Sequence, residues 1–242
     1  MNGRSVPGWL TQWEFAHRGL HRPGVPENSL AASEGAIARG MGIECDIQLS
    51  ADGVPMVFHD WELSRLTGGE GPTGAHAAEA IEALHLLGTE QRPPRFADFL
   101  AAVAGRVPVL IEVKSMPGYD AERSCRAIRE PLAIYEGVFA VMSFDPRVPI
   151  WFREHAPETI RGLVGTDTYD NGFKGVWRDP AAIAAAQPDF LAIDVRDLGY
   201  PEAAAWRAGG HPLLTWTVRS PETRATGLAH ADALIAEGEG LA

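Results

Sequence analysis

Short apolar runs alternate along the chain with longer segments in which apolar residues recur every three or four positions. The short runs predict buried strands, and the longer periodic segments predict helices. Strands are expected near residues 13–16, 42–48, 55–60, 107–113, 138–143, 160–164, 190–194, 212–217 and 232–236. Helices are expected near residues 29–39, 75–87, 96–104, 120–130, 146–155, 180–186, 201–208 and 221–228. Strands that alternate with helices in this way predict a parallel sheet covered by helices.

The chain length favours a closed form of this sheet. At 242 residues, the chain is close to the ~250 residues that are usual for an eight-stranded α/β barrel. We therefore expect a single TIM (β/α)8 barrel domain over residues 1–242, with a short loop and helix insertion at about 67–95. No G-x-G-x-x-G motif opens a helix after a strand, which argues against a dinucleotide-binding fold.

The connection between the second and third strand-like runs is expected to be irregular. Only 13 positions separate Asp46 from His59, and a helical crossover does not fit within that length. Nine strand-like runs are also one more than the eight strands of a barrel. We therefore expect one run to lie outside the barrel or to form a short antiparallel piece near residue 50.

Two carboxylates interrupt the apolar run at 42–48. Because alternate side chains share one face of a strand, Glu44 and Asp46 are expected to point the same way. Two buried like charges repel each other and are costly to desolvate. A bound cation would remove both penalties, and oxygen ligands suit Mg²⁺ or Ca²⁺. Taken alone, the pair fits a solvent-facing edge strand with two surface acids equally well.

Further polar residues fall at the carboxyl ends of other expected strands, where a barrel enzyme has its active site. They are His17, Arg18, His59, Glu112, Lys114, Ser143 and Trp216. Each one has an ordinary structural explanation, such as a loop hydrogen bond, an internal salt bridge or core packing. The gathering of all of them at one rim favours a functional site.

The residue types at this rim indicate metal-assisted phosphoryl chemistry. The three carboxylates Glu44, Asp46 and Glu112 form a plausible oxygen cage for one divalent cation. Arg18 and Lys114 are suited to an anion, because the planar guanidinium of arginine in particular matches the geometry of a phosphate or a carboxylate. Histidines from two different strands are suited to act as general acid and general base.

The order of these motifs closely resembles the glycerophosphodiester phosphodiesterase family, over nearly the whole chain. The matching motifs are His17-Arg18-Gly19, Pro26-Glu27-Asn28-Ser29, Glu44-Cys45-Asp46, Asp52-Gly53, Val57-Phe58-His59-Asp60, Leu63-Ser64-Arg65-Leu66-Thr67, Ile111-Glu112-Val113-Lys114, Ser143-Phe144 and Trp216-Thr217-Val218. The resemblance implies a compact TIM-barrel enzyme that hydrolyses glycerophosphodiesters to glycerol 3-phosphate and an alcohol. It also implies one divalent cation, Mg²⁺ or Ca²⁺, as cofactor.

The resemblance further assigns roles to individual residues. It implies acid–base catalysis by His17 and His59, metal binding by Glu44, Asp46 and Glu112, phosphate binding by Arg18 and Lys114, a substrate-hydroxyl or supporting role for Glu27, and an apolar wall near the glycerol made by Phe144 and Trp216. We expect the reaction to pass through a cyclic phosphate formed by the glycerol 2-hydroxyl, with His17 as the first base. Direct attack by metal-bound water is the alternative route.

Two positions depart from the family pattern. The family usually ends its last strand with Thr-Asp, and this chain has Ile235-Ala236-Glu237; Arg219 stands where Asn is frequent after Trp-Thr-Val. Both changes are expected to alter the rim from which the alcohol leaves, so the preferred alcohol stays open.

The composition of the chain limits the kinds of binding partner that we expect. The net charge of -11 argues against nucleic acid and anionic membranes, because both require a basic face. The first ten residues contain no apolar run long enough for a signal peptide or a membrane span. We therefore expect a cytoplasmic monomer or homodimer that acts on a small molecule and has no stable association with membranes. The two cysteines, Cys45 and Cys125, lie in no disulfide or zinc motif.

Three other functions remain as alternatives. A lysophospholipase D or a sphingomyelinase D-like enzyme shares the barrel and the metal site but acts on a lipid. A second alternative is a barrel that binds phosphorylated ligands without catalysis. A metal-dependent sugar isomerase fits the carboxylates and histidines, but it explains Arg18 and Lys114 only if its substrate is phosphorylated.

Overall fold

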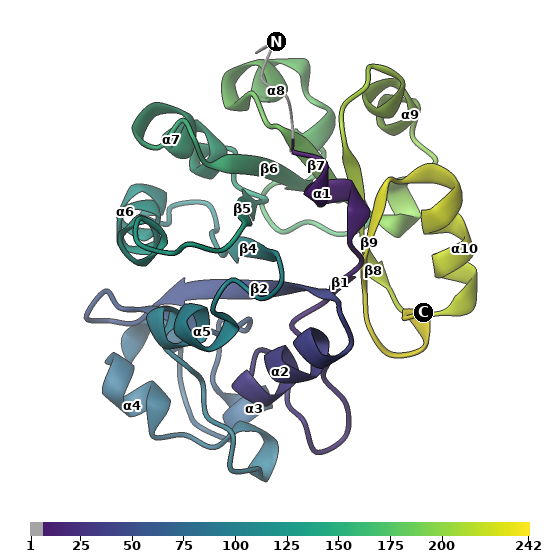
Figure 1. Ribbon diagram of the computed structural model, residues 1–242. Helices are drawn as coiled ribbons and strands as arrows, with labels where there is room; N and C mark the ends of the chain where they lie inside the picture. Colours follow the sequence, from purple (N-terminus) through teal and green to yellow (C-terminus); the bar gives the residue numbers. More distant parts are fainter. Residues whose placement is uncertain (1–6) are drawn as a thin grey trace.

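The computed structural model describes residues 7–242, in which eight parallel strands close into a barrel (Figure 1). The barrel strands are β1 (Phe15–Ala16), β2 (Gly42–Leu49), β4 (Val109–Val113), β5 (Phe139–Ser143), β6 (Ile160–Gly165), β7 (Phe190–Asp194), β8 (Leu213–Val218) and β9 (Ala233–Ala236). Strand β1 closes the barrel because it pairs with both β2 and β9. The predicted TIM barrel is confirmed.

The ninth strand-like run lies outside the barrel. Strand β3 (Pro55–Val57) pairs antiparallel with the end of β2, so that Val57 lies opposite Ile47. The predicted irregular connection is therefore confirmed, because a hairpin takes the place of a helical crossover. The strand ends earlier than the expected 55–60. His59 and Asp60 follow it in a loop, and His59 lines a cavity at the mouth of the barrel.

Helices cover the outside of the barrel, as the ring of coiled ribbons in Figure 1 shows. They are α2 (Leu30–Ala38), α3 (Ser64–Thr67), α4 (Ala78–Glu82), α5 (Phe96–Val103), α6 (Ala121–Leu132), α7 (Arg147–His155), α8 (Pro180–Ala186), α9 (Pro201–Ala208) and α10 (Pro221–His230). Helix α1 (Trp9–Gln12) instead lies across one end of the barrel, where its Leu10 joins the interior apolar cluster. The helix expected at 75–87 is shorter than predicted. It consists of α4 between two 3₁₀ turns, η1 (Thr73–Ala75) and η2 (Leu86–Gly88).

Alternation along β2 separates the apolar core from the polar site. Ile43, Cys45 and Ile47 are fully buried in a cluster with apolar residues of α5 and α6. Inside the barrel, a second apolar cluster fills the space below the polar residues. That filling is tight, since a Cβ at Gly162 would lie 2.3 Å from the ring of Phe190. The interior is thus packed with side chains, and the polar groups are confined to one end.

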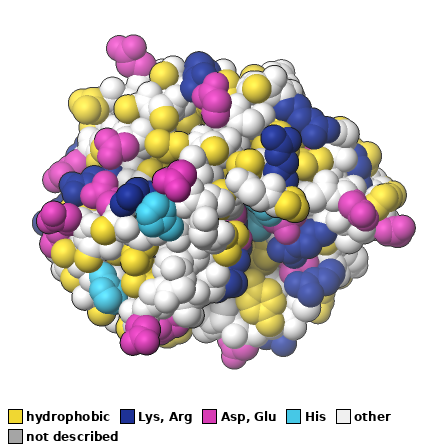
Figure 2. Space-filling model, turned by 90° about the horizontal axis from the view of Figure 1, so that it is seen from below, with side chains coloured by type: hydrophobic (Ala, Val, Ile, Leu, Met, Phe, Trp, Pro, Cys, Tyr) yellow, Lys and Arg dark blue, Asp and Glu magenta, His cyan; other side chains and the backbone are white. Residues whose placement is uncertain are grey.

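The structure also bears on the surface charges, on membrane-spanning helices and on the two cysteines. Figure 2 shows one face of the molecule, on which acidic and basic side chains are interspersed. Among residues 7–242, no helix has both the length and the apolar composition needed to span a membrane. The expectation about a signal peptide falls partly on residues 1–6, which lie outside the described residues. Cys45 and Cys125 are buried free thiols.

Candidate active site

The carboxyl ends of the barrel strands enclose a polar cavity of about 240 Å³. Of the residues predicted from sequence, it is lined by His17, Arg18, Glu44, His59, Glu112, Lys114, Phe144 and Trp216. Asp46 and Glu27 lie behind the lining and contact it through Arg18. The structure therefore brings all ten predicted site residues together, from segments that are far apart in the sequence.

Strand register places three carboxylates side by side. Asp46 of β2 lies opposite Glu112 of β4, and Glu44 precedes Asp46 on the same face. One oxygen from each of the three carboxylates lies within 4.8 Å of the others. Their exposures are only 1%, 2% and 9% for Glu44, Asp46 and Glu112. Such closely spaced buried charges require compensation.

The compensation is uneven among the three carboxylates. Burial raises the pKa of Glu44 well above its usual range, and the charges of Asp46 and Glu112 raise it further. Burial alone would also raise the pKa of Asp46, but electrostatic interactions with His59, Arg18 and Lys114 hold it well below its usual value. The charge and the backbone N–H of Arg18 offset the effects on Glu44 only in part, so ionised Glu44 needs a further compensating charge.

A divalent cation would supply that charge. The oxygen of Glu44 that faces the site accepts a hydrogen bond from the backbone N–H of Arg18, at 3.0 Å. Three clustered carboxylates provide hard oxygen donors, and such donors are preferred by Mg²⁺ and Ca²⁺. The residues present thus fit the predicted metal site.

Arg18 and Lys114 lie on either side of the carboxylate cluster. Nη1 of Arg18 donates to Glu27 at 2.6 Å, and its Nε lies 3.2 Å from Asp46. Nζ of Lys114 donates to Glu112 at 2.9 Å. Burial would lower the pKa of Lys114, but the charges of Glu112 and Asp46 raise it above its usual value. Both side chains therefore stay cationic beside the cavity, where an anionic substrate can meet them.

The turn after β1 places His17 and Arg18. Gly19 has a φ of +77°, and a Cβ there would lie 2.8 Å from the backbone carbon of Ala32 in α2. Any other residue would be strained at this positive φ and would clash with the backbone of Ala32, so the turn requires glycine. His17 itself is 7% exposed, and its Nε2 lies 4.0 Å from Glu44. Burial lowers the pKa of His17 to about 4, so the imidazole is neutral at pH 7 and able to accept a proton.

His59 occupies a different environment. Its side chain is 30% exposed, and Nδ1 lies 2.6 Å from Asp60. Gln48 holds this loop, because its Nε2 donates to the carbonyls of Phe58, His59 and Asp60 at 3.1, 2.9 and 2.7 Å. The two histidines therefore face one cavity from different depths, with a carboxylate behind each.

An apolar wall completes the cavity. The rings of Phe144 and Trp216 pack edge to face, with centroids 5.3 Å apart. Nε1 of Trp216 donates to the carbonyl of Ala192 at 2.9 Å, which fixes the indole. Tyr169, from the loop after β6, and Arg196, from the 3₁₀ turn η4 (Val195–Asp197) after β7, also line the cavity.

Comparison with known proteins identifies the family to which a chain with this site belongs. The family model of glycerophosphoryl diester phosphodiesterases matches residues 17–236. The chain belongs to that family. The prediction made from the motifs is thereby confirmed, as is the prediction of an enzyme of the glycerophosphodiester phosphodiesterase class.

Individual relatives agree with this assignment. Glycerophosphodiester phosphodiesterase 1 of Bos taurus is 44% identical over a match that covers 85% of this chain and 71% of that protein. Glycerophosphodiester phosphodiesterase of Caldanaerobacter subterraneus is 34% identical over 51% of this chain, and the match spans about half of that protein, 48%. Among solved structures, an Oleispira antarctica phosphodiesterase superimposes with a TM-score of 0.80 at 22% identity, covering 93% of this chain and 92% of that one. The last comparison supports the fold.

Several residues at the family site were not predicted from sequence. Asn28 donates to Asp46 at 3.0 Å, although the sequence showed it only as part of a family motif and gave its side chain no role. The neighbouring Ser29 caps α2. Gln48 carried a usable signal, because it is the third polar side chain in phase with Glu44 and Asp46 on β2. Ser143, in contrast, was among the polar residues expected at the rim, and its hydroxyl donates to the carbonyl of Val113.

Arg65 links the carboxylate that contacts Arg18 to the carboxylate that contacts His59. It donates to both oxygens of Glu27 at 2.8 Å and to Asp60 at 2.8 Å. Glu27 in turn contacts Arg18, and Asp60 contacts His59. Arg65 stands in a motif that supports the family resemblance, but its position in the sequence gave no role to its side chain.

We predict that Arg65→Ala lowers kcat/KM about tenfold, because Glu27 and Asp60 would no longer be held in place beside Arg18 and His59. A tenfold loss corresponds to ~1.4 kcal/mol. The free energy of unfolding should change by no more than ~1 kcal/mol, since the side chain is half exposed. Steady-state kinetics and thermal unfolding measure the two effects. Arg126→Ala is the matched control, because Arg126 forms an exposed pair with Glu122 on α6. Equal kcat/KM in the two variants would contradict the prediction.

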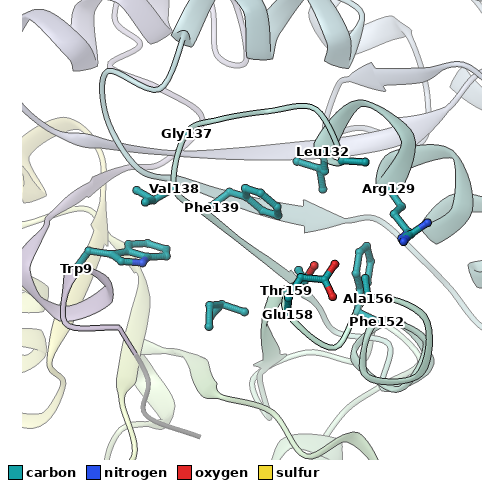
Figure 3. A pocket seen from close by; sticks show the side chains of 12 residues that line it. Trp9, Arg129, Leu132, Gly137, Val138, Phe139, Phe152, Ala156, Glu158 and Thr159 are labelled. Carbon is teal, nitrogen blue, oxygen red and sulfur yellow. The ribbon is translucent and has the colours of Figure 1, made fainter.

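A second hollow, of about 340 Å³, lies at the other end of the barrel (Figure 3). Apolar side chains dominate it, including Trp9, Phe139 and Phe152, while Arg129 and Glu158 are also among the labelled residues. Phe139 begins β5, so this hollow is at the amino ends of the strands. It shares no residue with the candidate active site.

Proposed function

We propose that the chain hydrolyses glycerophosphodiesters to glycerol 3-phosphate and an alcohol, in a reaction that depends on Mg²⁺ or Ca²⁺. The observation that carries this proposal is one cavity that combines a three-carboxylate cluster, two cationic side chains and two histidines. Phosphodiester hydrolysis uses every one of these groups. A sugar isomerase would leave Arg18 and Lys114 without a role unless its substrate carried a phosphate.

The size of the cavity agrees with a small substrate. About 240 Å³ is enough for a glycerol phosphate unit, with the alcohol group directed toward the open rim. The Oleispira antarctica phosphodiesterase with the same fold was solved with sn-glycerol-3-phosphate as product. A glycerol phosphate in the corresponding cavity of this chain would meet Arg18 and Lys114 with its phosphate and the wall of Phe144 and Trp216 with its carbons.

The surroundings of the two histidines support the roles that we assign to them in this proposal. When bound, the cation supplies electrostatic stabilisation of the phosphate and acidifies the glycerol 2-hydroxyl. Arg18 and Lys114 hold the phosphate by charge. His17, which is neutral and lies next to the carboxylate cluster, takes the proton of the 2-hydroxyl. His59, which is nearer to solvent, gives a proton to the departing alcohol.

Attack by the 2-hydroxyl gives a cyclic phosphate, which water then opens with the two histidines in exchanged roles. A substrate that lacks the 2-hydroxyl cannot form this ring. We predict that such an analogue loses at least ~10²-fold in kcat, the lower end of what one proton-transfer group contributes. Single-turnover assays with matched 2-hydroxy and 2-deoxy diesters measure the ratio. Equal rates would instead favour direct attack by water.

The proposed function is tested by the product. Glycerophosphocholine and glycerophosphoethanolamine are incubated with the protein in Mg²⁺ or Ca²⁺, and glycerol 3-phosphate is measured by an enzyme-coupled assay. A lysophospholipid and sphingomyelin serve as parallel substrates. Release of glycerol 3-phosphate from the water-soluble diesters supports the proposal. Cleavage of only the lipids would transfer the function to the lysophospholipase D or sphingomyelinase D type. Binding without turnover would favour a non-catalytic barrel.

Other features of the protein stay predictions. They are the single domain over residues 1–242 with its insertion at about 67–95, the cytoplasmic location, the absence of stable membrane association and the monomeric or homodimeric state.

A further inference from the structure

We propose that Glu237 is the residue that positions His17, by holding its imidazole in the tautomer with the proton on Nδ1, and that Arg219 fixes the orientation of the Glu237 carboxylate. This inference rests on the proposed function, in which His17 acts as the base. It gives a joint role to the two positions at which the chain departs from the family pattern.

Glu237 lies where it can reach three side chains at once. It directly follows β9, and its backbone N–H donates to the carbonyl of Val218 at 2.9 Å. One carboxylate oxygen, Oε2, contacts Nδ1 of His17 and lies 3.2 Å from Nε2 of His21. The other oxygen, Oε1, accepts a hydrogen bond from Nε of Arg219. The side chain of Glu237 is 18% exposed, so most of it is shielded from water.

The contact with Glu237 determines the proton position on His17. An ionised carboxylate only accepts hydrogen bonds, and a neutral imidazole has one N–H donor. Nδ1 must therefore carry the proton, which leaves the lone pair on Nε2. Nε2 lies 4.0 Å from Glu44 and faces the cavity, where the base is needed. In the opposite tautomer, the lone pair of Nδ1 would face the carboxylate of Glu237. Nε2 would then carry a proton and could not accept one from the substrate.

Arg219 fixes the orientation of the carboxylate. Its side chain is 58% exposed and lines the cavity, yet its Nε is engaged by Glu237. With a glutamate at 237, both oxygens accept and no conflict arises. With a glutamine, Arg219 would attract the amide oxygen, and the amide NH₂ would then face Nδ1 of His17. An NH₂ donor at that place stabilises the tautomer in which Nδ1 accepts and Nε2 carries the proton.

The inference predicts a loss that a second substitution relieves. In the serine protease triad, placing the wrong imidazole tautomer by an acid-to-amide change lowers kcat by about 10⁴. We expect Glu237→Gln to lower kcat by ~10²–10⁴ with a smaller effect on KM. Adding Arg219→Ala to Glu237→Gln should recover at least tenfold, because the amide oxygen is then free to turn toward His17.

A spectroscopic measurement tests the tautomer without turnover. Imidazole ¹⁵N NMR on the metal-free protein identifies which ring nitrogen of His17 carries the proton, and the signal is assigned by its loss in His17→Gln. We expect the proton on Nδ1 in the wild type, on Nε2 in Glu237→Gln, and again on Nδ1 in the double variant. Glu122→Gln, a change at an exposed carboxylate of α6, is the matched control and should alter neither the tautomer nor kcat.

The outcomes separate this inference from the proposed function. If the wild type releases no glycerol 3-phosphate, the proposed function fails, while the NMR result still decides how Glu237 positions His17. If the wild type turns over but Glu237→Gln keeps its kcat or its Nδ1 proton, the inference is overturned and the proposed function stands. Failure of Arg219→Ala to recover activity in the double variant would overturn the part assigned to Arg219.

Discussion

Glu44→Gln is expected to abolish turnover and, at the same time, to make the metal-free protein more stable. Glu44 is 1% exposed and shares its site with Asp46 and Glu112. Burial, followed by the charges of these two neighbours, raises its pKa well above its usual range. Glutamine keeps the size of the side chain and an oxygen that can accept from the N–H of Arg18, but it removes the charge that a cation requires.

The sign of the stability effect depends on pH. Above the ordinary glutamate pKa of 4.5, the unfolded chain ionises at this position while the folded protein resists ionisation, so folding carries a free-energy cost. That cost is present at pH 7 and disappears as the pH falls below the ordinary pKa. Glutamine removes it, and ~1 kcal/mol would raise Tm by ~2–4 °C in a protein of this size.

Thermal unfolding at pH 7 and at pH 4, with and without Mg²⁺ or Ca²⁺, measures these effects. The wild type should gain Tm on addition of metal, because a ligand that binds only the folded state stabilises it. Glu44→Gln should start higher at pH 7, converge with the wild type at low pH and gain little from metal. Glu122→Gln should follow the wild type throughout. A metal-induced rise in Tm that is unchanged in Glu44→Gln would contradict the assigned metal site.

The second large effect is a difference between the two histidines. His17→Ala and His59→Ala are each expected to lower kcat on glycerophosphocholine by ~10²–10⁴-fold. On a glycerophosphodiester whose leaving group is p-nitrophenol, only His17→Ala should be equally slow. An acidic phenol departs without a proton donor, so the general acid becomes dispensable and the base does not.

The ratio of kcat on the two diesters, measured for each variant against the wild type, assigns the roles. The depth of each side chain supports the expected assignment, since His17 is buried next to the carboxylates and His59 is 30% exposed. If His17→Ala recovers on the p-nitrophenyl diester and His59→Ala does not, the roles are reversed. Near-full activity of either variant on glycerophosphocholine would remove that histidine from the mechanism.

The sequence predicted those parts of the site that depend on local patterns. The alternation of Glu44 and Asp46 with apolar residues placed both carboxylates on the inner face of β2, and strand register brought Glu112 beside them. The short spacing between Asp46 and His59 predicted the hairpin that replaces a helix. These features follow from the twofold period of a strand and from the length of extended chain.

The sequence did not predict contacts that barrel closure creates. His17 and Glu237 are 220 positions apart and meet only because β1 lies between β2 and β9. Tyr169 and Arg196 reach the cavity from a loop and from a three-residue 3₁₀ turn, which are too short or irregular to carry a periodic signal. Arg65 is in a four-residue helix whose sequence does not show that it faces Glu27 and Asp60.

The measurement that tests the central proposal most directly is release of glycerol 3-phosphate from glycerophosphocholine, followed by ³¹P NMR. The protein is treated first with EDTA and then with an excess of Mg²⁺ or Ca²⁺, beside Glu44→Gln under the same conditions. We expect no release in EDTA, release by the wild type after metal is restored, and none by the variant. Release that continues undiminished in EDTA, or that Glu44→Gln catalyses at the wild-type rate, would contradict metal-dependent hydrolysis at this carboxylate cluster.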